Sequence, residues 1–134
     1  MTDHELVQTA FSMLERAYVP YSQFPVGAAL RCKDGTVFTG CNVENAAYGS
    51  TICAERTALV KAVSEGHLSD WNAIAIAGNS ADYCWPCGAC RQMLFEFCPD
   101  LNVLVARADG DFVSLPLKKL LPYGFGPESL TVEA

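Results

Sequence analysis

Three cysteines have the spacing of a metal site. Cys87 and Cys90 form a C-x-x-C pair directly after Pro86, and Cys53 lies earlier in the chain. At the first turn of a helix, a C-x-x-C pair places two thiols on one face, close enough to bind one metal ion. The pair by itself leaves three interpretations open: a zinc site, a redox dithiol, or two ordinary core cysteines.

The number of candidate ligands favours a catalytic zinc site. Structural zinc is usually closed by four protein ligands, whereas catalytic zinc keeps three and leaves the fourth position to water. If Cys53, Cys87 and Cys90 hold the ion, the pKa of that water falls from about 15.7 toward about 7. The sequence then predicts a zinc-bound hydroxide nucleophile at neutral pH.

Glu55 has the right type and position for proton transfer at such a site. It follows Cys53 by two residues, so its carboxylate can lie near the water without being a ligand. It could then take the proton of the water and deliver protons to the substrate and its leaving group. Without the cysteines, Glu55 would be interpreted as a surface carboxylate that the helix macrodipole favours in a first turn.

The charge of the site calls for compensation. Three thiolates and one zinc ion sum to about −1, and a bound hydroxide makes this about −2. Arg56 and Arg91 are predicted to donate hydrogen bonds to the thiolate sulfurs, as are the two helix N-termini. The alternative for each arginine is a solvated helix face.

Helices and strands alternate along the chain in a way that could position these residues. The capping-box spacing of Thr2 and Glu5 begins a predicted helix over residues 3–18, which Pro20 ends. Alternating apolar residues predict a hairpin of strands 26–32 and 37–41. The further predicted elements are a helix over 53–64, a strand over 73–77, a helix over 86–97, strands over 101–106 and 112–115, and a short helix over 117–121.

This order predicts one α/β domain over residues 1–134. We expect a three-layer αβα arrangement with a mixed sheet of about five strands, the first pair antiparallel. Ligands bind such folds at helix N-termini beside strand ends. Both cysteine segments are placed at predicted helix starts.

Composition limits the classes of function. The chain is 51% hydrophobic and carries a net charge of −6 with nine scattered Lys and Arg residues, which argues against a nucleic-acid substrate. Seven cysteines without a predicted export signal favour metal-binding thiolates over disulfides, and no apolar run has the length of a membrane span. We therefore expect a cytoplasmic protein without a membrane partner. The remaining cysteines are predicted to be buried small hydrophobes: Cys32, Cys41, Cys84 and Cys98.

Taken together, these segments closely resemble the cytidine deaminase family, in its short, homotetrameric, zinc-dependent branch. The matching stretches cover nearly the whole chain: residues 20–29, 40–48, 53–58, 86–92 and 121–127. The resemblance implies a cytidine deaminase fold with one Zn²⁺ per subunit and a hydrolase acting on the C–N bond of a cyclic amidine. Cytidine and deoxycytidine would give uridine and deoxyuridine plus ammonia, as in pyrimidine salvage. Zinc-bound hydroxide would attack C4 while Glu55 shuttles protons.

The resemblance also implies roles for substrate-binding residues. Asn42 and Glu44 look like the residues that hold the ribose hydroxyls, Phe24 like an aromatic wall against the pyrimidine, and the backbone of Ala54 like a partner of the base. From the sequence alone, Asn42 would instead be a turn residue and Phe24 a core residue.

The family branch further implies a homotetramer with shared active sites. It places Tyr48 and Phe125 beside the pocket of a neighbouring subunit. A tail aromatic such as Phe125 has little core of its own to join, and the alternative is that it packs under its own subunit.

The chain departs from the family pattern at two points. Cys53 stands where the signature of zinc deaminases has a histidine, as in the short tetrameric branch. Tyr83, Cys84 and Trp85 precede Pro86 where small or aliphatic residues and a serine are more usual. The second departure predicts a changed pocket rim with the ligands intact.

Other functions stay open. A blasticidin-type aminonucleoside deaminase would share size, fold and zinc motif, although the segment 42–48 favours a nucleoside. A polynucleotide deaminase would be expected to carry a basic surface. A zinc-stabilised interaction module would need a fourth ligand, and neither His4 nor His67 lies at motif spacing.

Overall fold

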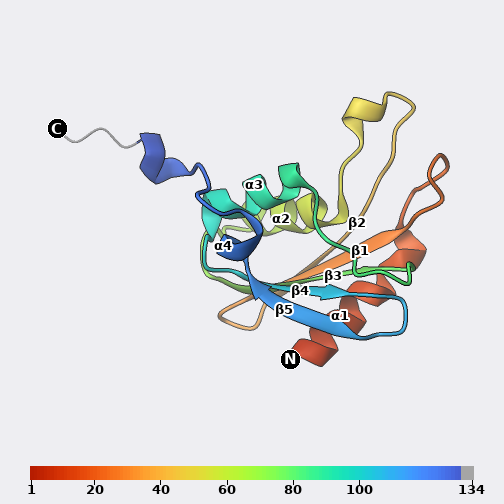
Figure 1. Ribbon diagram of the computed structural model, residues 1–134, viewed down its shortest axis with the longest axis horizontal. Coiled ribbons are helices and arrows are strands. Elements are labelled where there is room, and N and C mark those ends of the chain that lie inside the picture. Colours follow the sequence, from red (N-terminus) through yellow and green to blue (C-terminus); the bar gives the residue numbers. More distant parts are fainter. Residues whose placement is uncertain (131–134) are drawn as a thin grey trace.

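A five-stranded mixed sheet organises the chain in a computed structural model, which describes residues 1–130 (Figure 1). The strand order is β2-β1-β3-β4-β5. β1 is antiparallel to β2 and β3, β4 is parallel to β3, and β5 is antiparallel to β4. The strands are β1 (Val26–Cys32), β2 (Val37–Cys41), β3 (Trp71–Gly78), β4 (Asn102–Ala106) and β5 (Phe112–Pro116). The predicted mixed sheet of about five strands is confirmed.

Helices cover both faces of this sheet. α1 (Asp3–Ser12) packs on β1 and β3, whereas α2 (Ala54–Ser64) packs on β2 and β1. Figure 1 shows α1 below the sheet and α2 with α3 (Gly88–Phe97) above it, and α4 (Leu117–Leu120) contacts α3 and β5. The three-layer αβα prediction is therefore confirmed.

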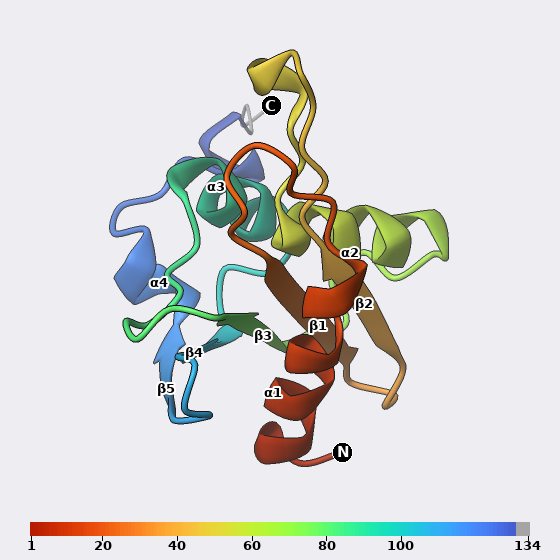
Figure 2. The same ribbon diagram turned by 90° about the vertical axis from the view of Figure 1, so that its right-hand side faces the viewer.

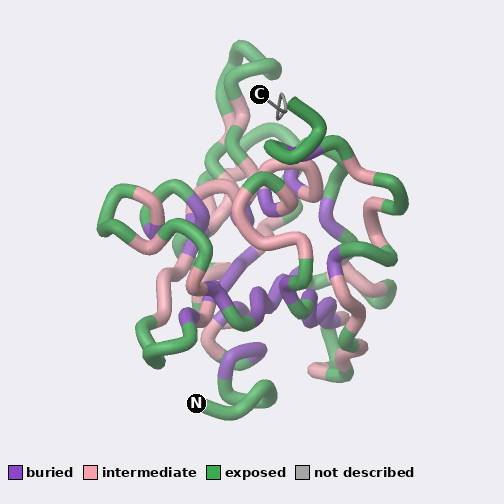
Figure 3. The backbone as a smooth tube through the Cα atoms, turned by 90° about the vertical axis from the view of Figure 1, so that its left-hand side faces the viewer, coloured by how far each residue is buried: buried purple, intermediate pink, exposed green. Residues whose placement is uncertain are grey.

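Alternation along the strands separates two apolar layers. Ala29 and Ala75 face the cluster that contains Leu6 of α1, whereas Leu30 and Ile74 face the cluster that contains residues of α2. Because successive strand residues point to opposite faces, each central strand contributes to both layers. Figure 3 shows this buried backbone in the middle of the molecule with exposed loops around it.

Two glycines allow the helices to lie against the hairpin. A Cβ atom on Gly27 would lie 1.9 Å from the carbonyl oxygen of Ala10 in α1. A Cβ atom on Gly40 would lie 2.3 Å from the carbonyl oxygen of Ala54, at the start of α2. The contact at Gly40 therefore sets how closely the first turn of α2 approaches β2.

The predicted first helix is wrong in its C-terminal part. α1 ends at Ser12, and a short 3₁₀ helix, η1 (Leu14–Arg16), follows. Tyr18 is extended because its N–H donates to the Asn42 carbonyl at 3.0 Å and its carbonyl accepts from the Glu44 N–H at 2.9 Å. A helix that continued to residue 18 could not form this long-range pairing.

The other predicted elements are present with shifted ends. Pro86 was expected inside the first turn of a helix, but α3 begins at Gly88 with Cys87 as its N-cap, so that placement is wrong. Similarly, Cys53 is the N-cap of α2 rather than its first residue. Residues 131–134 of the predicted domain lie outside the described part of the chain. No helix within residues 1–130 is long and apolar enough to cross a membrane.

Candidate metal centre and active site

The starts of α2 and α3 bring three thiols together. Cys53 and Cys87 are the N-cap residues of these helices, and Cys90 lies in the first turn of α3. The Sγ atoms of Cys53 and Cys87 are 3.8 Å apart, and those of Cys87 and Cys90 are 3.4 Å apart. Neither N-cap side chain caps its own helix, so both thiols remain available to a metal ion.

The geometry of these thiols fits zinc with one open position. Thiolates about 2.3 Å from a tetrahedral zinc ion are about 3.8 Å from one another, close to the observed separations. Within residues 1–130, no further Cys, His, Asp or Glu joins this group. An interaction module folded around zinc would need that fourth ligand, so the donor set favours catalytic zinc.

Arg56 lies against the thiols. Its Nη2 is 3.4 Å from the Sγ of Cys53 and 3.4 Å from the carbonyl oxygen of Thr51. Hydrogen bonding with Cys90, and then with Arg56, lowers the pKa of the Cys53 thiol, whereas the pKa of the Cys90 thiol is raised by its bond with Cys53. The guanidinium thus makes the contact that charge compensation of a thiolate requires.

Arg91 has different partners from those expected. Its Nε donates to the Pro86 carbonyl at 2.8 Å, and its Nη1 donates to the Leu120 carbonyl at 2.8 Å. None of its hydrogen bonds among the described residues reaches a sulfur. Arg91 therefore ties the segment before α3 to the end of α4, and this bonding supports the position of Cys87.

Among the described residues, Glu55 is the one charged residue that is buried. Only 4% of its surface is exposed. Burial raises the pKa of its carboxyl to about 7, and the Cys53 thiolate acts in the same direction. A carboxyl that titrates near neutral pH can both accept and donate a proton. The alternative of a solvated surface glutamate is wrong.

A cavity of about 190 Å³ opens beside these groups. It is lined by Phe24, Val26, Asn42, Thr51, Cys53, Ala54, Glu55, Cys84, Trp85 and Cys87. Phe24 and Ala54 are therefore at the metal centre, where the family resemblance places the base. Cys84 was expected to be only a buried small hydrophobe, but it lines this cavity with Trp85. In the sequence, the unusual residues Cys84 and Trp85 directly before Pro86 indicated that the rim of the pocket is changed.

Asn42 holds the edge of this cavity through its side-chain amide. Its Oδ1 accepts from the Val26 N–H at 2.9 Å, and its Nδ2 donates to the Phe24 carbonyl at 2.9 Å. The amide thereby fixes the chain at the start of β1. A simple turn role for Asn42 does not explain this long-range clamp.

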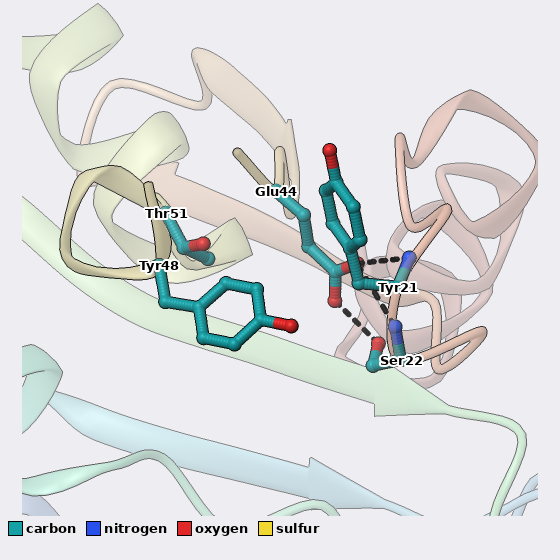
Figure 4. A pocket seen from close by; sticks show the side chains of 5 residues that line it. All are labelled: Tyr21, Ser22, Glu44, Tyr48 and Thr51. Atoms are coloured by element: carbon teal, nitrogen blue, oxygen red, sulfur yellow. Dashed lines mark hydrogen bonds between the residues drawn. The ribbon is translucent and has the colours of Figure 1, made fainter. Parts of the chain in front are cut away.

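Glu44 lies in an adjoining cavity of about 300 Å³, which shares Thr51 with the first (Figure 4). Its carboxylate accepts from the backbone N–H groups of Tyr21 and Ser22 at 3.0 and 3.1 Å, and from the Ser22 hydroxyl. The hydrogen bond from the Ser22 hydroxyl is the largest of the effects that lower the pKa of the Glu44 carboxyl. Glu44 is thus an ionised group on a loop that borders the metal centre.

Tyr48 and Phe125 do not line the small cavity of their own chain, although Tyr48 lines the adjoining cavity with Glu44. Tyr48 is 75% exposed on η2 (Tyr48–Ser50), within the loop that projects from the molecule in Figure 2. Its ring forms an edge contact with Tyr21 at 5.9 Å between centroids. Phe125 is 56% exposed, and its carbonyl accepts from the Gln92 side chain at 2.7 Å.

Comparisons with known proteins agree with this geometry. A family model described as cytidine and deoxycytidylate deaminase zinc-binding region matches residues 1–106. The chain is 45% identical to a cytidine deaminase of Sporosarcina psychrophila over 100% of this chain and 98% of the relative. It is 49% identical to that of Halalkalibacterium halodurans over 93% of this chain and 95% of the relative.

A solved structure is similar as well. The crystal structure of cytidine deaminase from Burkholderia pseudomallei has a TM-score of 0.90 and 47% identity, covering 93% of this chain and 100% of that one.

Proposed function

The chain belongs to the cytidine and deoxycytidylate deaminase family, and from this premise we infer that it deaminates cytidine and deoxycytidine hydrolytically to uridine and deoxyuridine plus ammonia. The observation that carries this conclusion is the buried carboxyl of Glu55, on the wall of a cavity that also exposes Cys53 and Cys87. The thiols that would hold a water-activating metal thereby lie beside a proton carrier, where a small substrate can enter.

Cys53, Cys87 and Cys90 would hold one zinc ion, which supplies Lewis-acid activation of a water molecule by lowering its pKa toward about 7. Glu55 takes a proton from this water. It then delivers protons to the ring nitrogen N3 and to the departing amine, so that water and cytidine become uridine and ammonia. Burial suits Glu55 to this exchange because it weakens the preference of the carboxyl for the ionised form.

The walls of the cavity suit a nucleoside. Phe24 offers an aromatic surface to the pyrimidine, and the backbone of Ala54 offers hydrogen-bonding groups to the base. Asn42 and Glu44 are proposed to hold the ribose hydroxyls. Their side-chain oxygens can accept further hydrogen bonds besides those they already form within the chain. Arg56 balances the thiolate charge directly, whereas Arg91 acts through the position of its segment.

A homotetramer would complete this site. The loop between β2 and α2 projects with exposed apolar side chains, among them Val43, Tyr48 and Ile52. Exposed apolar groups gathered on one segment are typical of a protein interface. In the assembly, Tyr48 and Phe125 would cover the pocket of a neighbouring subunit.

A cytoplasmic location and a free nucleoside substrate complete the proposal. A reducing compartment keeps metal-binding thiols available. The net charge of −6 disfavours a polyanionic substrate, which would need a basic surface.

The direct test is the absorbance change on deamination of cytidine by the zinc-loaded protein. Removal of zinc by a chelator should abolish the change, and stoichiometric zinc should restore it. A parallel assay with an aminonucleoside antibiotic of the blasticidin class separates the two deaminase activities. Turnover of that antibiotic by zinc-replete protein that leaves cytidine and deoxycytidine unchanged would overturn the proposal.

A further inference from the structure

A second group of metal-ligating side chains lies at the opposite end of β1 from the active site. Cys32, Asp34, His67 and Asp70 each offer one ligand atom, and these atoms all lie within 4.8 Å of one another. The first two belong to the end of β1 and its turn into β2, and the others to the connection from α2 to β3.

Backbone hydrogen bonds hold these two segments together. The N–H of Lys33 donates to the Asp70 carbonyl at 2.7 Å, and Cys32 is paired with Trp71 across the β1–β3 ladder. The N–H of His67 donates to the Ala62 carbonyl at 2.9 Å, at the end of α2. Backbone pairing therefore brings the two segments together, and the side-chain contact between His67 and Asp70 adds to it.

The Cys32 thiol is buried and unpartnered. Only 2% of the residue is exposed, and its Sγ makes no hydrogen bond within residues 1–130. Burial, and to a lesser extent the carboxylates of Asp70 and Asp34, raise the pKa of this thiol to about 11. The thiol is therefore protonated near neutral pH, and a cation that binds it would displace its proton while offsetting the charges of the two carboxylates.

The other three side chains keep capacity for a metal ion. His67 Nδ1 is 2.7 Å from Asp70 Oδ2, and Asp34 Oδ1 accepts from the Thr36 N–H at 2.9 Å. Each carboxylate therefore has a further oxygen available. The His67 ring also forms an edge contact with Phe38 at 5.3 Å between centroids, which limits its orientation.

We propose that Cys32, Asp34, His67 and Asp70 form a second, structural zinc site. One sulfur, one nitrogen and two oxygens suit zinc, whereas calcium and magnesium prefer oxygen ligands alone. Donor atoms around tetrahedral zinc are about 3.3 to 3.8 Å apart, so binding requires shifts of about 1 Å from the present positions. The exposed Asp34 can move by this amount more easily than buried Cys32.

Four protein ligands give this site a structural rather than a catalytic character. Val26 lines the active-site cavity at one end of β1, and Cys32 lies at its other end, about 20 Å away at the rise of a β-strand. The second ion would therefore stay away from the substrate. Its effect would be to fasten the hairpin turn to the α2–β3 connection.

The test counts metal ions in the complete protein. Zinc-loaded protein dialysed against low micromolar free zinc should hold two ions per chain by elemental analysis. Cys32→Ser and His67→Gln should each lower this to one while cytidine turnover is retained. Cys98→Ser is the matched control, because Cys98 is a neighbouring half-buried thiol that contacts Trp71 and lies outside the group, and it should keep two.

A measurement on the unaltered chain keeps the proposal falsifiable if the variants fold poorly. Cadmium-113 substitution should give two resonances, one shifted far downfield by three sulfur ligands and one less shifted by a single sulfur. One ion per chain with one resonance in the wild-type protein would overturn the second site, as would two ions in both folded variants. If the wild-type protein held both ions but did not turn over cytidine, that result would count against the proposed function alone.

Discussion

The metal centre and the loop between β2 and α2 are neighbours in the chain but differ in how they are supported. Ala54, Glu55 and Cys90 are buried within the single chain, at helix starts that pack on the sheet. The loop carries Tyr48 outward into solvent. The groups for bond cleavage are thus gathered in one chain, whereas those proposed to enclose the substrate are left uncovered.

The exposed loop is nevertheless organised at its base. Val43 and Ile52 exchange two backbone hydrogen bonds of 2.9 and 3.0 Å, which join the two arms of the loop. Its tip contains the short helix η2. In the proposed homotetramer, such a preformed arm would lose less conformational entropy on docking than a disordered segment would.

Glu55→Gln should give the largest effect, because it removes the proton carrier from the buried region. We expect kcat to fall by about 10²- to 10⁴-fold, with zinc content and cytidine binding retained, because the amide keeps the shape of the carboxyl. Steady-state kinetics and metal analysis check this result. Glu65→Gln alters an exposed carboxylate at the other end of α2 and should change little. Near-normal turnover in zinc-replete Glu55→Gln would refute the proton-transfer role.

Phe125→Ala should have the next largest effect. It tests whether this exposed aromatic completes the active site of a neighbouring subunit. Loss of a buried aromatic contact costs about 1.5 to 3 kcal/mol, which corresponds to about a 10- to 150-fold loss of kcat/KM. Tyr123→Ala is the control, because Tyr123 is a fully exposed aromatic in the same tail. A fully active monomer by light scattering at the assay concentration would contradict the shared site.

Subunit exchange adds a second readout to the Phe125 prediction. When Phe125→Ala and Glu55→Gln proteins are mixed and allowed to exchange, hybrid tetramers should recover part of the activity. The reason is that an intact Glu55 from one chain can then meet an intact Phe125 from another. No recovery after exchange has been verified by mass spectrometry would count against sites composed of two chains.

Glu44→Gln should give the smallest effect, because Gln keeps the shape of the side chain and one acceptor oxygen. Glu44 has two roles to separate. It anchors the backbone at Tyr21 and Ser22 and is also proposed to hold a ribose hydroxyl. We expect kcat/KM for cytidine to fall by about tenfold, the value of one hydrogen bond to a charged group. The penalty should shrink for a cytidine analogue that lacks both ribose hydroxyls. An equal penalty for both substrates would leave Glu44 as a loop anchor only.

The sequence predicted most of the fold because its signals are local. Alternation of apolar residues located the hairpin, and the capping box of Thr2 and Glu5 located the start of α1, where both reciprocal hydrogen bonds are present. The end of α1 was wrong because Tyr18 pairs with the segment around Val43, a contact that no local periodicity encodes. Boundaries are set by such competition between local propensity and long-range hydrogen bonds.

For the site, the sequence by itself determined the kind of chemistry, and the tertiary structure decided which other side chains take part. Three thiols without a fourth ligand and a nearby carboxylate indicate catalytic zinc, because residue types and short spacings carry that information. Only the packing of α2 and α3 separates Arg56, which contacts a thiol, from Arg91, which binds two carbonyls. The group around Cys32 likewise comes from two segments that meet across β1 and β3. Contacts of this kind depend on the positions of distant backbone segments, which spacing along one chain does not reveal.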